Sequence, residues 1–393
     1  MGLQNTRGND MTSRTSGAGF ILLAALLCIA SAAPASDVPA RGEDRAGPPG
    51  VEGWGSRLET EALATSPLTL AAPRAVGPLV LGSDVVNDST LVASVDLGRY
   101  TEILAILSGH QPFELAGQIK QIRTRWTLEP DAPDGIALAR DYLQDRFMAA
   151  GYPVQLQSFD VSNHAGITAT NVIAVKTGLS RPDEILVVGA HYDATAIRDA
   201  GNDAPGAEDN ASGTAGVLHL AELLEAWETE RTIHFVAFGA EEQGLHGSTW
   251  YAQKAIDDGL QIVGALTMDM ISAWVDDYGI LIEGTNAYEE LMFAVRDNVV
   301  EWTTLDFDLS YFSFDSDHVP FQERGIPAIL GIDLDWAAHT DNHKSTDTFD
   351  KVDPSLGTEI TRAMAGTVAD IAGLRDVIVP VAASTTGRLK GRW

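Results

Sequence analysis

Between residues 111 and 375, continuous apolar runs alternate with stretches in which apolar residues recur at helical spacing. The continuous runs have the length of strands that are buried on both faces of a sheet, and they lie at residues 184–190, 232–240, 263–270 and 326–332. Two further strands are predicted before them, at residues 154–161 and 171–177. Helices are predicted at residues 136–151, 212–227, 247–259, 286–302 and 354–376. This order predicts an α/β fold with a mixed, mainly parallel central sheet flanked by helices.

Acidic and histidine side chains follow the predicted strands at their carboxyl ends, where ligand sites form in such sheets. They are His191, Asp193, Asp209, Glu241, Glu242, Asp269, His339, His343 and Asp347. Taken singly, each has an ordinary structural explanation, such as a helix cap or an acidic loop. Their joint arrival at one edge of a sheet indicates a metal site, and oxygen and imidazole ligands without thiolates suit Zn²⁺ or a similar divalent ion.

The charge balance and the cysteine content exclude several classes of protein. The chain has 26 Lys and Arg against 55 Asp and Glu, which gives a formal net charge of −29. A chain this acidic repels phosphate backbones, so we expect no nucleic-acid partner. Cys28 is the single cysteine, which excludes a disulfide within the chain and a cysteine-based zinc site. Any metal must therefore be held by His, Asp and Glu.

Five motifs at the strand ends resemble, in order, those of the co-catalytic di-zinc exopeptidases, in particular the secreted bacterial leucyl aminopeptidase type. The motifs are HYD, PGAEDNASG, FVAFGAEEQGLHGS, TMDM and HKSTDT. The resemblance covers roughly residues 111–375. It implies a phosphorylase/hydrolase-like α/β core that carries two zinc ions.

The resemblance also implies which residues hold the two ions. Asp209 would bridge them, His191 and Asp269 would complete one site, and Glu242 and His343 would complete the other. Elementary chemistry supports a bridging carboxylate, because two ions about 3.5–4 Å apart need a shared anionic ligand. The family has a cis peptide bond after the bridging aspartate.

Two more acids have implied supporting roles. The resemblance implies that Glu241 is the general base. Glu241 and Glu242 are adjacent and point in different directions at a strand end, so one can bind metal while the other faces the water. Asp193 would lie behind His191, because two residues apart on an extended segment it can reach the distal ring nitrogen.

Two histidines compete for the last ligand position. The family places Asp-Thr four and five residues after its ligand, and Asp347 and Thr348 stand at that distance from His343. From His339 the same positions are His343 and Lys344. We therefore assign His343 as the ligand and keep His339 as the alternative.

The sequence does not identify the residue that would stabilise the oxyanion. Residues 316–321, SDHVPF, resemble an Asp-His pair that lies near the substrate in this family. The secreted type has a disulfide and a tyrosine just before this pair, and the tyrosine assists the oxyanion. Here Ser313 stands at the tyrosine position and no cysteine is near. Tyr311 and His318 remain as candidates for the oxyanion or for substrate contact.

The chain is predicted to have four parts. Residues 1–35 read as a signal peptide, because the apolar run at 20–33 is too short for a membrane span of about 20 residues and small residues follow it; a retained N-terminal anchor is the alternative. Residues 36–110 are predicted to be a linker with either a pro-region or a strand-rich N-terminal extension. Residues 111–375 would form the peptidase domain and 376–393 a C-terminal tail.

These features together predict a secreted or periplasmic aminopeptidase with two Zn²⁺ per chain. Its partners would be peptides with a free N-terminus, and we expect a monomer without stable membrane association after signal cleavage. A small-peptide carboxypeptidase, or a glutaminyl cyclase that uses one zinc, is the alternative on the same core. A non-catalytic receptor-like relative would be marked by loss of ligands, and this sequence retains all five.

Overall fold

The computed structural model describes residues 85–274, 278–313 and 315–375. The predicted signal peptide, the linker up to residue 84 and the predicted tail at 376–393 lie outside the described residues. Among the helices that are described, none combines the length and the apolar character that a membrane span requires.

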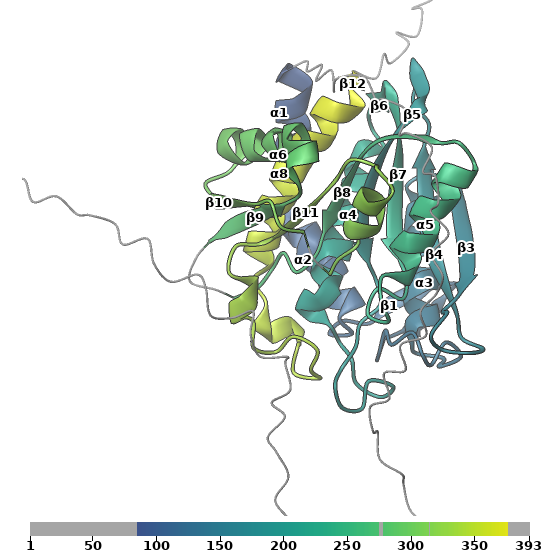
Figure 1. Cartoon of the computed structure of the whole chain (residues 1–393). Helices are drawn as coiled ribbons and strands as arrows, with labels where there is room; N and C mark the ends of the chain where they lie inside the picture. The colour runs from purple at the N-terminus through teal and green to yellow at the C-terminus, as the bar shows by residue number, and fades with distance from the viewer. Residues whose placement is uncertain (1–84, 275–277, 314, 376–393) are drawn as a thin grey trace, which may run out of the picture. The chain divides into compact units, whose positions relative to one another are not determined.

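An eight-stranded mixed sheet forms the centre of the fold, in the order β10-β9-β11-β8-β5-β7-β4-β3, with β10 and β3 at its two edges (Figure 1). The strands are β3 (Val154–Asp160), β4 (Thr168–Lys176), β5 (Arg181–His191), β7 (Arg231–Phe238), β8 (Gln261–Met268), β9 (Gly279–Glu283), β10 (Asp306–Ser310) and β11 (Ala328–Asp333). The four central strands β11, β8, β5 and β7 are parallel. Antiparallel pairs join β9 to β11, β4 to β7 and β3 to β4. The predicted mixed, mainly parallel sheet is confirmed.

Helices cover both faces of this sheet. One core contains residues of α1 (Val85–Ala93), α2 (Leu97–Leu107), α3 (Ile136–Ala149), α4 (Gly213–Leu224), α6 (Glu289–Trp302) and α8 (Pro354–Ala372). The other contains residues of α5 (His246–Asp257) and α7 (Val319–Glu323). Short elements complete the chain: β1 (Phe113–Leu115), β2 (Gln118–Lys120), β6 (Glu228–Thr229), β12 (Leu374–Arg375), the single π-helical turn η1 (Ala207–Ser212), and the 3₁₀ turns η2 (Asn286–Tyr288), η3 (Trp336–Ala338) and η4 (Phe349–Lys351).

Strand β5 shows why its sequence is apolar without interruption. Leu186 and Val188 belong to the core beneath α4 and α8, whereas Ile185 and Val187 belong to the core beneath α5 and α7. Successive side chains of a strand point to opposite faces, so a strand with helices on both sides needs an apolar residue at every position. The same arrangement leaves polar residues only at the strand ends.

Residues 85–93 and 97–107 are helical, so the described part of this segment is not strand-rich, which was one of the two alternatives. Asp96 caps α2 by accepting the backbone N–H of Arg99 at 2.8 Å. The apolar residues that follow recur at helical spacing and are fully buried in the larger core, namely Tyr100, Ile103, Leu104 and Leu107. The helical period becomes visible only after the cap, since the preceding apolar runs are too short to show a period. The described part of the predicted extension is therefore packed into the same core as α4 and α8.

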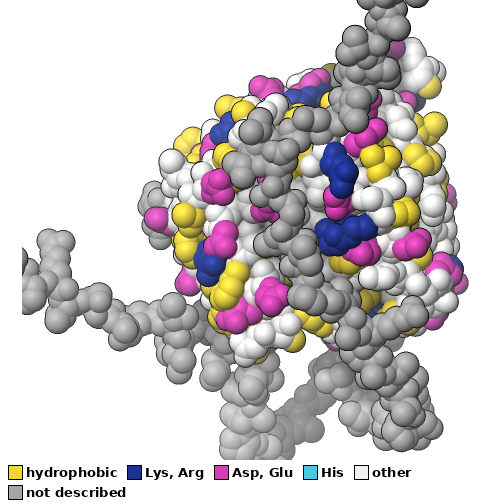
Figure 2. Space-filling model, turned by 90° about the horizontal axis from the view of Figure 1, so that it is seen from above, with side chains coloured by type: hydrophobic (Ala, Val, Ile, Leu, Met, Phe, Trp, Pro, Cys, Tyr) yellow, Lys and Arg dark blue, Asp and Glu magenta, His cyan; other side chains and the backbone are white. Residues whose placement is uncertain are grey.

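The acidic balance of the sequence is also seen on the surface. On the face shown in Figure 2, acidic side chains lie interspersed with hydrophobic ones, and basic side chains stand singly or in small groups among them.

Replacing Leu104 with Ala tests whether α2 is part of the core. Leu104 is fully buried, so the change should lower the free energy of unfolding by about 2–5 kcal/mol, measured by urea denaturation. Leu97, at the start of the same helix, is 43% exposed, and Leu97→Ala is the matched control, expected to stay within about 0.5 kcal/mol of the unmodified chain. Equal stability of the two variants would contradict the packing of α2.

Candidate metal centre

The carboxyl ends of the central parallel strands bring the predicted acids and histidines to one edge of the sheet. His191 is the last residue of β5, Glu241 and Glu242 follow the end of β7 closely, and Asp269 directly follows β8. Asp209 comes from η1, which precedes α4. His191 and Asp209 thus lie within buried parts of such elements, and Glu241, Glu242 and Asp269 lie just beyond buried strands.

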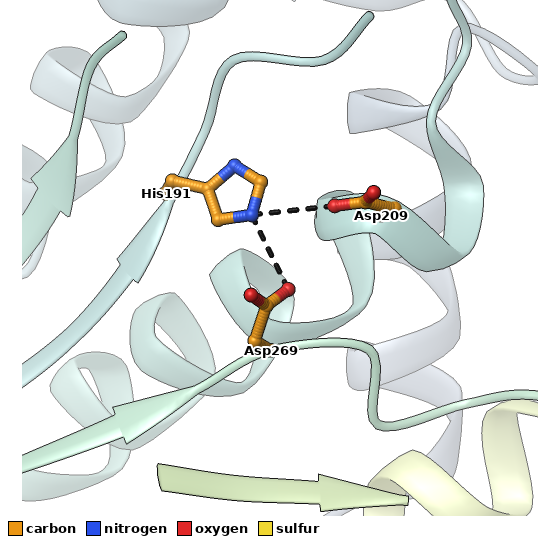
Figure 3. Close-up of side chains that lie close together, drawn as sticks. All are labelled: His191, Asp209 and Asp269. Carbon is orange, nitrogen blue, oxygen red and sulfur yellow. Dashed lines mark hydrogen bonds and ion pairs between the residues drawn. The ribbon is translucent and has the colours of Figure 1, made fainter. Parts of the chain in front are cut away.

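One group contains His191, Asp209 and Asp269, all of them buried. The Nε2 atom of His191 lies 3.3 Å from Oδ1 of Asp209 and 3.2 Å from Oδ1 of Asp269. Figure 3 shows the imidazole and both carboxylates pointing toward a common point, although they come from three separate segments. One oxygen or nitrogen of each residue lies within 4.8 Å of the others, which is compact enough for one ion.

A second group contains Asp209 again, with Glu242 and His343. The Nε2 atom of His343 lies 3.2 Å from Oδ2 of Asp209 and 3.0 Å from Oε2 of Glu242. Asp209 thus turns one carboxylate oxygen to His191 and the other to His343. This is the arrangement that a carboxylate shared between two ions requires.

The segment that carries Asp209 is tightly anchored. The peptide bond between Asp209 and Asn210 is cis, as the resemblance implied. The backbone N–H groups of Glu208 and Asp209 both donate to the carboxylate of Asp347, at 2.9 and 3.0 Å. The side-chain amide of Asn210 donates to the carbonyl of Met268 at 2.9 Å. These bonds fix the position of the Asp209 carboxylate relative to β8.

His339, the alternative to His343, lies next to this anchor. Its Nε2 atom is 3.4 Å from Oδ1 of Asp347, and it belongs to neither group. The structure thus brings His343 to the cluster and leaves His339 supporting the acid that holds the Asp209 segment.

Asp193 contacts both halves of the site. Its carboxylate is 3.7 Å from Nδ1 of His191, and its main-chain carbonyl is closer to that atom, at 3.2 Å. The same carboxylate accepts the backbone N–H groups of Glu241 and Glu242, at 3.1 and 3.3 Å. Asp193 therefore fixes the turn that carries the glutamate pair, which the sequence did not indicate.

Crowding of buried carboxylates and imidazoles shifts the pKa values of these groups. Burial raises the pKa of Glu242 to about 7, and burial also raises the pKa of Glu241 well above its ordinary value. Contacts with Asp209 and Glu242 raise the pKa of His343 to about 10. Burial opposes ionisation of Asp209, but its contacts with His191 and His343 hold its pKa below the ordinary value. The crowded carboxylates thus draw protons onto their neighbours, as expected of a site shaped for cations.

One orphaned oxygen supports the same conclusion. Among the described residues, Oε1 of Glu242 is buried and has no hydrogen-bond partner. A buried carboxylate oxygen without a donor is unfavourable unless a cation completes its surroundings. The donor set of carboxylates and imidazoles therefore fits divalent metal ions.

A cavity of about 370 Å³ opens over the two groups. Glu241 lines it but belongs to neither group, and its Oε2 atom is 3.9 Å from Nε2 of His191. The apolar part of the lining is formed by Leu245, Met270, Leu330, Ile332 and Trp336.

The two candidates for oxyanion or substrate contact, His318 and Tyr311, lie in different surroundings. His318 is buried, with Nε2 3.2 Å from Oε1 of Glu283, and Glu283 lines the cavity. Tyr311 is 40% exposed and donates its hydroxyl hydrogen to Glu289 at 2.7 Å, and it does not line the cavity. Neither placement identifies an oxyanion donor.

Two contacts to the ligands were missed in the sequence. Ser316 donates its hydroxyl hydrogen to Oδ2 of Asp269 at 2.8 Å, and Asn342 donates its amide to Oδ2 of Asp209 at 3.2 Å. The only signals were their positions, next to the Asp-His pair and next to His343.

Parts of this chain are similar in sequence to known proteins. A probable zinc metalloprotease of Pyrenophora teres f. teres is 35% identical over 170 residues, which are 40% of this chain and 35% of that protein. Aminopeptidase YwaD of Bacillus subtilis is 31% identical over 163 residues, 40% of this chain and 34% of that one. The chain thus spans about a third of the length of these curated relatives.

The fold itself has solved counterparts. The aminopeptidase from Aneurinibacillus sp. strain AM-1 superposes with a TM-score of 0.57 at 19% identity, covering 75% of this chain and 98% of that one. The model of Peptidase family M28 matches residues 171–368, which is half of the chain and includes every residue of both groups. This chain therefore belongs to peptidase family M28.

Proposed function

We propose that this protein is a zinc-dependent aminopeptidase of the secreted leucyl type, which hydrolyses the N-terminal residue from peptides. The observation that carries the proposal is the position of Asp209, whose two oxygens face two separate histidines. A single-ion site needs no such shared carboxylate.

In this proposal His191, Asp209 and Asp269 would hold one zinc ion, and Asp209, Glu242 and His343 would hold the other. Bound zinc would act as a Lewis acid and would lower the pKa of a water molecule.

Glu241 is proposed as the general base. It lies beside the ligands, lines the cavity and is committed to neither group, so its carboxylate is free to take a proton from the attacking water and pass it to the leaving amine. Asp193 would keep this carboxylate in place through the N–H of Glu241.

The charge of the cavity supports recognition of a free amine. The five acids of the centre, Asp193, Asp209, Glu241, Glu242 and Asp269, carry −5 against +4 from two zinc ions. Glu283 and Asp315 add to the lining, which includes no lysine or arginine among the described residues. Such a cavity attracts an ammonium group, whereas a carboxypeptidase needs a cationic side chain for the substrate carboxylate.

A non-catalytic receptor and a cyclase have less support. A receptor-like relative would not need a complete set of ligands, and a cyclase with one zinc would not need the second group.

We also propose that the protein is exported to the periplasm or the medium as a monomer after loss of residues 1–35, which lie outside the described residues.

Substitutions of the two adjacent glutamates should have different effects. Glu241→Gln should leave zinc content unchanged while kcat falls by about 10²–10⁴-fold, because the water loses its proton acceptor. Glu242→Gln should lower the zinc content instead. Metal analysis and steady-state kinetics on both variants measure this, and the opposite pattern would mean that the two roles are exchanged.

The two histidines should also separate. His343→Ala removes a proposed ligand, so zinc should fall from two ions toward one per chain and activity should be lost. His339→Gln should retain both ions, since His339 belongs to neither group and its ion pair is with Asp347, the acid that anchors the Asp209 segment. Zinc loss confined to the His339 variant would disprove the assignment.

The end of the substrate that is recognised can be tested with blocked peptides. Acetylation of the N-terminus should abolish cleavage, because it removes the ammonium group, while amidation of the C-terminus should be tolerated. Product analysis by mass spectrometry distinguishes the outcomes. Cleavage of acetylated but not of amidated peptides would indicate a carboxypeptidase on the same metal centre.

A further inference from the structure

Arg125 is fully buried, and its guanidinium donates only to main-chain carbonyls in the hydrogen bonds that the structure gives it. Nε donates to Tyr192 at 2.7 Å, and Nη2 donates to Gly206 at 2.8 Å. Nη1 donates to Leu107 at 2.6 Å and to Pro205 at 2.5 Å. A planar group with several fixed donors holds its acceptors at set distances from one another.

These carbonyls belong to three segments that are remote in the chain. Tyr192 directly follows the ligand His191, whereas Pro205 and Gly206 begin the turn that carries Asp209. Leu107 is the last residue of α2. One side chain thus ties the ends of β5 and α2 to the start of the Asp209 segment.

The contact with Gly206 leaves no room for adjustment. Gly206 has a φ of +49°, which is the left-handed region that favours glycine. A Cβ atom there would lie 2.3 Å from the carbonyl oxygen of Asp209 and 2.9 Å from Nη2 of Arg125. The backbone of this turn is therefore packed directly against the guanidinium.

The main chain around Arg125 adds further ties to the same loops. Its carbonyl accepts the N–H of Ala194 at 3.1 Å. On either side, Thr124 donates its hydroxyl hydrogen to the carbonyl of Ala200, and Thr127 donates to Oδ2 of Asp193. Residues 124–127 thus run along the loop that connects His191 to Asp209.

The charge of Arg125 suits this place. Burial lowers the pKa of Arg125 to about 10, so it remains a cation at neutral pH, and the carboxylates of Asp347 and Asp193 oppose that lowering. Its positive charge lies behind a centre in which carboxylates outnumber the charges of two zinc ions. A buried cation with four carbonyl acceptors is well satisfied, whereas its removal would take a donor from each of them; of the four, the Gly206 carbonyl has a second donor, the N–H of Ala211 at 3.0 Å.

We propose that Arg125 is a positioning residue of the metal centre, which sets the spacing between His191 and Asp209. In this proposal α2 and the segment up to Arg125 are a permanent part of the mature enzyme. Cleavage of a pro-region at residue 110 would remove the Leu107 carbonyl and Tyr100, whose hydroxyl contacts Ser272 and Ser212 behind the Asp209 turn. The proposal rests on the two-ion centre proposed above but not on the choice of substrate.

The test uses Arg125→Lys and Arg125→Met in the full chain. The methionine removes the charge and all donors, and the lysine keeps the charge without the planar fork. Zinc affinity is measured by competition with a chromogenic chelator, and folding of the metal-free proteins by circular dichroism and thermal unfolding. Loss of residues that orient ligands weakens metal binding by about 10–100-fold, so we expect this for methionine, with lysine in between.

Arg231→Lys is the matched control. Arg231 is also buried and donates to a main-chain carbonyl, that of Ile371, but it begins β7 at the end of the sheet away from the metal centre. It should lose stability without losing zinc affinity. Equal zinc affinity of the unmodified chain and folded Arg125 variants would overturn the proposal, and so would equal zinc loss in the Arg231 variant.

If neither Arg125 variant folds, hydrogen exchange of the unmodified chain decides. Zinc should slow the exchange of amides at residues 104–111 together with those at 206–213, because the guanidinium connects the two segments. Slowing confined to 206–213 would overturn the inference. If the unmodified chain binds no zinc, the two-ion centre fails first, and the two failures are thereby distinguished.

Discussion

Most of this structure depends on holding several carboxylates together at one edge of a sheet. Like charges at this distance repel, and burial adds a desolvation penalty, so the chain must supply compensation. The buried cation Arg125 supplies opposite charge nearby, and backbone N–H groups that donate to two further acids hold the turns in place. Asp347 receives those of Glu208 and Asp209, and Asp193 receives those of Glu241 and Glu242. The turns that carry Asp209 and Glu242 are thus each anchored to a buried carboxylate.

The sequence predicted the parts of this arrangement that are local. The buried strands β5, β7, β8 and β11 appear as unbroken apolar runs because both of their faces are covered. A residue directly after such a run must lie at the sheet edge, which is why His191 and Asp269 could be placed there. The choice of His343 over His339 depended on spacing within one loop; in the structure the Nε2 atom of His343 lies beside Asp209 and Glu242.

Features that depend on contacts between remote segments were not predictable. The role of Arg125 rests on carbonyl groups, which every residue has, so no pattern of side chains marks it. Strands β9 and β10 were not predicted from the sequence because they are short. In β10, at the edge of the sheet, acidic residues alternate with apolar ones. Tyr311 was a candidate because of its position in the chain, yet its hydroxyl turns to Glu289, a direction that the sequence does not encode locally.

The wide spacing of the proposed ligands along the sequence affects the stability of the folded protein. They come from the ends of β5, β7 and β8, from η1 and from the loop after β11, and they span residues 191 to 343. In an unfolded chain neither of these two groups exists, because each is assembled only when these segments lie side by side. Under the proposed two-ion centre, metal uptake would follow folding, and metal binding would stabilise the folded state relative to the unfolded one. The lifetime of the protein would therefore depend on the free zinc concentration where it folds, and a zinc-poor compartment would leave the correctly folded protein less resistant to unfolding and degradation.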